Sequence, residues 1–148
     1  MLNNDELRAL LEDWEATGHT DETVALRLSL AMWQWMKGSI KKTGKPVYKP
    51  EWTSYLGQLF PDLGLSMPES QCYLCEFAFK MMKEQPYCSK CPASWNEKTY
   101  NSSYPCRNGE YGEWWDEMKE SQDLEKLLSG AEAIISCIER ALEKPEKL

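Results

Sequence analysis

The chain has 148 residues and a net charge of −7 at neutral pH, with 42% hydrophobic and 28% charged residues. This length suffices for one domain with its own core, and this balance is ordinary for a globular protein. The sequence contains no apolar run of the roughly 18 residues that a membrane span needs. Its acidic N-terminus lacks the basic start of a signal peptide. We therefore expect a cytoplasmic protein that does not enter a membrane.

The first predicted helix runs from Asp5 to about Ala16, where leucines and a tryptophan recur at helical spacing. Polar residues in "NNDE" can cap its start, and Gly18 ends it. The second predicted helix begins near Thr20 or Asp21 and ends near Met36. It is apolar on most of its circumference, which indicates a helix buried between neighbours at the centre of the fold.

A lysine-rich stretch, "KGSIKKTGKPVYK", follows from Lys37 to Lys49 and carries five lysines and no acid. By contrast, residues 1–36 carry seven acids and two bases, and residues 110–148 carry eleven acids and five bases. We interpret the lysine stretch as a solvated connector between acidic helical regions. The next segment, "EWTSYLGQLF", is predicted to form a short helix.

A third long helix is predicted to begin at the S-x-x-E capping box of Ser66–Glu69, with a proline in its first turn, and to continue through "CYLCEFAFKMMK". The last helix carries an unbroken apolar stripe from Leu124 to Leu142. No segment predicts a strand. The sequence thus indicates an all-α protein, a small helical bundle in one domain over 1–148. Its helical core would be 1–36 and 116–144, and an irregular insert would occupy about 66–115.

The segment from Pro86 to Trp115 differs from the rest of the chain in its side chains. Its thirty residues include seven aromatic residues but no Ile, Leu, Val or Met. The segment has neither helical nor strand periodicity, and it is long for a structureless loop in a compact domain. We expect a bound metal to hold it, because thiolate–metal bonds fix a backbone where side-chain packing cannot.

Two C-x-x-C pairs, separated by twelve residues, supply four candidate ligands. Paired thiolates favour zinc, with iron as the competitor. The predicted site is therefore one structural zinc ion. Its predicted ligands are Cys72, Cys75, Cys88 and Cys91, with Cys106 as a possible substitute for one of them and disulfides as the alternative. The sixth cysteine, Cys137, borders the apolar stripe of the last helix and is predicted to be a buried core thiol.

A catalytic role is not indicated by the sequence. Catalytic zinc sites keep an open position and use histidine or carboxylate ligands. The single histidine, His19 in "TGHTDE", is predicted to be an exposed residue of a polar turn. Neither a phosphate-binding glycine loop nor a nucleophile motif is present. We therefore expect a protein that is not an enzyme and has no small-molecule substrate.

The order of motifs resembles a known group of proteins. A helical "ETVALRLSLAMWQWM" precedes "CYLCEFA" and "CSKCPASW", and a lone Cys106 and Trp114/Trp115 follow. This pattern is similar to a loosely defined group of small phage and prophage proteins that share C-x-L-C…C-x-x-C-P…C. The resemblance covers mainly residues 72–115. It implies a phage or prophage setting and a zinc site, and it implies no activity.

Two functions from different classes are consistent with these residues. In the first, a zinc-stabilised protein without catalysis binds a host protein, for example as an inhibitor of host defence or host machinery, in the host cytoplasm. Its aromatic residues would be the anchors. In the alternative, the insert and the Lys37–Lys49 loop associate with nucleic acid, where aromatic rings stack on unpaired bases. The acidic helices oppose this alternative, because affinity for phosphates depends on lysine and arginine.

Overall fold

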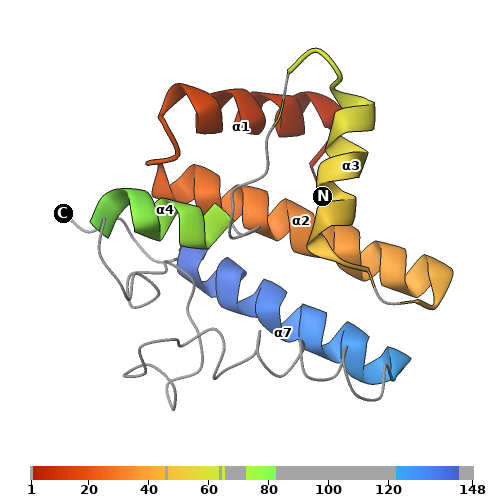
Figure 1. Ribbon diagram of the computed structural model, residues 1–148. Coiled ribbons are helices and arrows are strands. Elements are labelled where there is room, and N and C mark those ends of the chain that lie inside the picture. Colours follow the sequence, from red (N-terminus) through yellow and green to blue (C-terminus); the bar gives the residue numbers. More distant parts are fainter. Residues whose placement is uncertain (1, 46, 64, 66–72, 83–122, 144–148) are drawn as a thin grey trace.

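The computed structural model describes residues 2–45, 47–63, 65, 73–82 and 123–143. These residues form helices and contain no strand, so the predicted all-α class is confirmed (Figure 1). Of the predicted zinc-binding insert, about 66–115, the structure describes only residues 73–82, which form one helix; the rest lies outside the described residues. The helices are α1 (Asn4–Ala16), α2 (Glu22–Thr43), α3 (Lys49–Leu59), α4 (Tyr73–Met82) and α7 (Leu124–Glu143).

Helix α1 begins and ends close to the predicted positions. A reciprocal capping box forms its start: the Glu6 amide donates to Asn3 Oδ1 at 2.8 Å, and the Asn3 amide donates to Glu6 Oε1 at 3.4 Å. This exchange satisfies two backbone donors that the first turn leaves without helical partners. At the other end the chain turns at Gly18, which has a φ of 64°. The buried face consists of Leu7, Leu10, Leu11 and Trp14.

Helix α2 is longer than the sequence predicted. Its start is capped by Asp21, whose side chain accepts from the Val24 amide at 3.1 Å. The predicted end near Met36 is wrong, because the helix continues to Thr43 and stops at Gly44 with a φ of 70°. Ile40 explains the extension, since its side chain is fully buried and continues the apolar face beyond the lysines.

The interpretation of Lys37 to Lys49 as one solvated connector is therefore wrong for most of its length. Its first seven residues, 37–43, are the last turns of α2, and Lys49 is the first residue of α3. Lys37 pairs with Glu132 on α7, and Lys49 Nζ lies 5.8 Å from the centroid of the Trp33 ring. The lysines that remain exposed are Lys41, Lys42 and Lys45.

Helix α2 is the centre of the fold, as its apolar circumference predicted. It packs most extensively along α7 and also contacts α1, α3 and α4. Figure 1 shows α1 and α2 as an antiparallel pair, α7 antiparallel to α2 on the other side, and α3 crossing near the C-terminal half of α2. The core contributions of α7 are Leu127, Ala131, Ile134, Ile135, Cys137 and Ile138. The side chain of Cys137 is fully buried, so the prediction of a buried core thiol is confirmed.

Helix α4 also belongs to the packed part of the molecule, although it falls within the predicted insert. Tyr73, Leu74 and Phe77 are buried members of the same hydrophobic core as α1, α2 and α7. In Figure 1, α4 lies beside the N-terminal half of α2, which it contacts. The predicted start of this helix at Ser66–Glu69 lies outside the described residues, as does the predicted core segment 116–122.

Among the described helices, none combines the length and the apolar character that crossing a membrane requires.

Candidate metal centre and the histidine cluster beside it

Most of the predicted zinc ligands lie outside the part of the chain that the structure describes. These are Cys72, Cys88, Cys91 and the possible substitute Cys106. The backbone of Cys75 is placed, in the first turn of α4. Within the described ranges, no group of three or more His, Cys, Asp and Glu residues is arranged to hold a metal ion. The four-cysteine zinc site therefore stays a prediction, which rests on the donor set that the sequence supplies.

The structure does establish how the helix that carries Cys75 is attached. Tyr73, two residues earlier, is 3% exposed and accepts a hydrogen bond at 2.9 Å from Nε1 of Trp52 on α3. The Tyr73 ring also packs edge-on against Trp14 of α1, with centroids 5.7 Å apart. Leu74 and Phe77 complete the buried face. The first turn of α4 is thus fixed to α1 and α3 through one tyrosine.

A second attachment of α4 is made by His19, and the prediction of an exposed turn residue is wrong. The turn after α1 is a Schellman motif, in which the Gly18 amide donates to the Glu15 carbonyl at 3.1 Å and the His19 amide to the Trp14 carbonyl at 3.0 Å. His19 itself has a φ of 66°. This motif brings the residue after the glycine back over the last turn of the helix. The imidazole therefore packs against Trp14 and does not extend into solvent.

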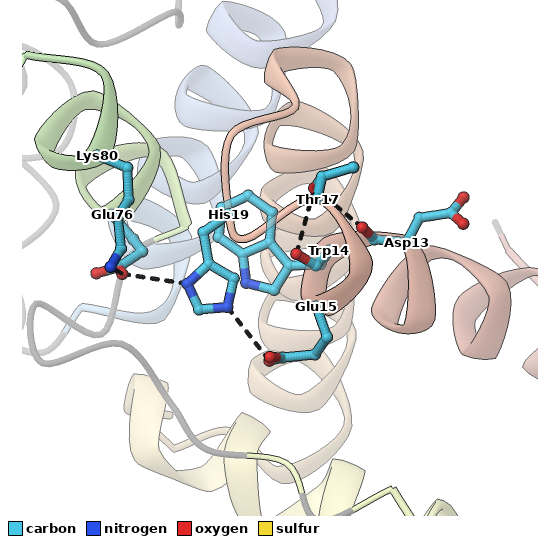
Figure 2. A network of polar contacts seen from close by, with 7 residues as sticks. All are labelled: Asp13, Trp14, Glu15, Thr17, His19, Glu76 and Lys80. Carbon is cyan, nitrogen blue, oxygen red and sulfur yellow. Dashed lines mark hydrogen bonds and ion pairs between the residues drawn. The ribbon is translucent and has the colours of Figure 1, made fainter.

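The imidazole of His19 lies between two carboxylates (Figure 2). Its Nδ1 is 3.1 Å from Oε1 of Glu76 on α4, and its Nε2 is 3.3 Å from Oε1 of Glu15 on α1. The ring stacks on Trp14 at 4.6 Å between centroids and 12° between planes. Lys80 Nζ lies 4.0 Å from the same Glu76 oxygen. We call these five residues the histidine cluster.

The histidine cluster is partly shielded from water, because the side chains of His19 and Glu76 are 19% and 17% exposed. A protonated imidazole donates from both nitrogens and can serve both carboxylates, whereas a neutral ring donates from one only. Whenever Nδ1 carries a proton, the ring joins the α1–α2 turn to α4 through Glu76. This arrangement positions α4: it holds the helix that carries Cys75 against the helical core.

Sequence reasoning missed the histidine cluster because its members are distant along the chain. His19 and Glu76 are separated by 57 residues, and their identities alone do not pair them. One local signal was available. A glycine directly after a helix predicts the Schellman motif, in which the following residue contacts the last helical turn, so Gly18 placed His19 near Trp14.

Comparison with known proteins adds no family to this picture. Neither the family models, nor the curated proteins, nor the solved structures contain a match to this chain.

Proposed function

We propose that this chain is a zinc-stabilised protein without catalytic activity, whose function is to bind another protein. The zinc would be held by the thiolates of Cys72, Cys75, Cys88 and Cys91, with Cys106 as a possible substitute. Bound there, the zinc would hold the segment from Pro86 to Trp115 in place. That segment has no Ile, Leu, Val or Met with which to form a core of its own. The resemblance of the cysteine pattern to phage and prophage proteins supports a host protein as the partner, in the host cytoplasm.

The observation that carries this proposal is the attachment of α4. Metal binding fixes an irregular segment only if at least some ligands stand on a rigid base. Cys75 lies between the buried Leu74 and the partly buried Glu76, both tied to the packed helices. A metal bound there would transmit the order of the helical core to the cysteine-bearing segment, and the seven aromatic residues of that segment would then form a defined surface.

Metal analysis of the purified protein tests the first half of the proposal. We expect about one zinc ion per chain, the stoichiometry of a single four-ligand structural site. Cys88→Ser should lose the zinc. The matched control is Cys137→Ser, which alters a buried thiol of α7 and should keep the zinc. A metal-free native protein with two disulfides by mass spectrometry would contradict the proposal.

Affinity capture from host lysate tests the second half. The expected result is a protein retained by the native chain and by Cys137→Ser, and lost from Cys88→Ser and from the chelated chain. Nuclease treatment and a gel shift with single-stranded nucleic acid distinguish protein binding from the alternative function, nucleic-acid binding. Fewer lysines are available to contact phosphates than the sequence suggested, because Lys37 pairs with Glu132 and Lys49 lies over the Trp33 ring. Retention that depends on nucleic acid would overturn protein binding.

A further inference from the structure

An open groove of about 280 Å³ lies on the molecule where α1 faces the segment that follows α3. Three leucines supply its apolar lining: Leu11 from α1, and Leu63 and Leu65 from the segment after α3. Two carboxylates from successive turns of α1, Glu12 and Glu15, supply its polar lining. Among the described residues, the lining of the groove therefore combines apolar and negatively charged side chains.

An ion pair fixes the two elements that form the groove. Arg8 of α1 donates from both terminal nitrogens to the two carboxylate oxygens of Asp62, with 3.2 Å between Nη1 and Oδ1. The Arg8 guanidinium also lies 5.8 Å from the centroid of the Phe60 ring. A bidentate pair of this kind gives a defined relative geometry. The segment carrying Leu63 is therefore held beside α1 before any ligand arrives.

A second, water-sized cavity shares Leu11, Glu15 and Leu65 with the groove as lining residues. Its volume, about 10 Å³, is that of roughly one water probe. The buried hydroxyl oxygen of Thr53 borders this cavity and has no hydrogen-bond partner among the described residues. A buried hydroxyl without a partner is costly, so this wall favours a ligand group that can donate to it, directly or through one water.

Size and charge together define what the groove accepts. Cofactors and drug-sized ligands occupy pockets of roughly 300–1,000 Å³, so this groove fits a single long side chain better. A long basic side chain can lay its methylene groups on leucines and keep its charge beside carboxylates. Arginine suits the site better than lysine, because its planar group carries several donors that match carboxylate geometry. Each carboxylate already has one neighbour of its own. Oε1 of Glu12 lies 3.5 Å from Nε of Arg8, and Oε1 of Glu15 lies 3.3 Å from Nε2 of His19.

We propose that this groove binds an arginine side chain presented by the partner protein. This inference rests on the proposed function, protein binding, and names the chemistry of one contact that the partner makes. The stem of the arginine lies on the partly exposed Leu63 and Leu65, above the buried Leu11. Its guanidinium meets the carboxylates of Glu12 and Glu15.

The test uses the full-length, zinc-loaded protein and a defined probe, the dipeptide acetyl-leucyl-arginine amide. Methyl-labelled leucines report on the groove by NMR titration. The comparison probe replaces arginine with citrulline, which keeps the shape and removes the charge. We expect the arginine probe to shift the methyl signals of Leu11, Leu63 and Leu65 selectively, with weaker binding at high salt. Citrulline should bind several-fold more weakly.

Two matched variants locate the charge. Glu15→Gln removes a carboxylate of the groove and should weaken the arginine probe by about three- to fivefold, the scale of an exposed ion pair. Asp13→Asn makes the same change on the same helix at an exposed residue that does not line the groove, and it should leave binding unchanged. Equal melting temperatures of the two variants would show that the fold is intact.

Equal binding of both probes, equal effects of both variants, or shifts scattered over the surface would overturn the arginine site. These outcomes are distinct from failure of the proposed function, which metal analysis and partner capture report. A chain that holds zinc and captures a partner, yet does not bind the arginine probe, would refute only this groove. A chain that binds the probe but holds no zinc and captures no protein would refute the proposed function.

Discussion

Helices α7 and α4 both pack on α2, but different kinds of contact hold them there. Helix α7 has 20 residues and buries a continuous aliphatic stripe, with Ala131, Ile134 and Ile138 fully inaccessible. Helix α4 has 10 described residues and is attached through a tyrosine hydroxyl and a carboxylate as well as Leu74 and Phe77. Helices shorter than about 12 residues are marginal without tertiary support. Burial of the aliphatic stripe therefore accounts for most of the attachment of α7, whereas α4 also uses individual polar contacts and, in our proposal, zinc.

The largest effect is expected from a charge placed in the α2–α7 interface. Ile135 is 4% exposed, so Ile135→Asp buries an unpaired carboxylate and should cost about 3–5 kcal/mol of unfolding free energy. The control, Lys42→Asp, alters an exposed residue in the last turn of α2 and should cost less than about 1 kcal/mol. Urea denaturation measures both. Similar losses in the two variants would contradict the assignment of core and surface.

A smaller loss is expected when the tyrosine attachment of α4 is cut. Tyr73→Phe leaves the buried Nε1 of Trp52 without its acceptor and should cost about 1–3 kcal/mol. Tyr55→Phe, on the half-buried tyrosine of α3, serves as the control and should change stability by no more than about 0.5 kcal/mol. The comparison between α4 and α7 would lose support if the two variants unfolded at the same urea concentration.

The histidine attachment should contribute less still. His19→Asn keeps a residue type that tolerates positive φ but removes the imidazole, which stacks on Trp14 and contacts Glu76 and Glu15, for an expected cost of about 1 kcal/mol. Combining it with Glu76→Gln in a double-mutant cycle isolates the contact between α4 and the α1–α2 turn. We expect a coupling energy of at least about 0.5 kcal/mol. Additive losses would show that the two side chains act independently.

The smallest expected effect concerns the edge of the groove. The hydrogen bonds from Arg8 lower the pKa of Asp62 below its usual 3.8. The ion pair therefore stabilises the fold at all pH values above about 3.8, and this contribution disappears as the pH falls through the lowered pKa. Asp62→Asn should lower the melting temperature slightly at pH 7, and its difference from the native protein should shrink as the pH falls below about 3.8. A difference that grows on acidification would contradict this assignment.

The sequence was informative where local rules decide the structure. The capping residues of "NNDE" and Gly18 located α1, and the apolar circumference of α2 correctly placed it at the centre. The end of α2 was missed because lysines and Gly38 suggested a connector, while burial of Ile40 kept the chain helical. The His19–Glu76 contact was missed because tertiary structure, not spacing, brings its partners together. The zinc site stays a prediction from the cysteine spacing.

We propose that α1, α2 and α7 pack without any metal, whereas α4 and the cysteine-bearing segment depend on bound zinc for their full order. The apolar stripes of α2 and α7 bury one another, but the residues from Pro86 to Trp115 include no Ile, Leu, Val or Met that could form such a stripe.

Hydrogen exchange of the purified chain, measured before and after chelation, tests this claim most directly. We expect chelation to remove amide protection from Pro86 to about Trp115 and to reduce it in α4, while α1, α2 and α7 remain protected. Cys88→Ser should reproduce this pattern, and Cys137→Ser should not. Loss of protection along the whole chain would contradict the account, because it would show that the metal supports the entire fold.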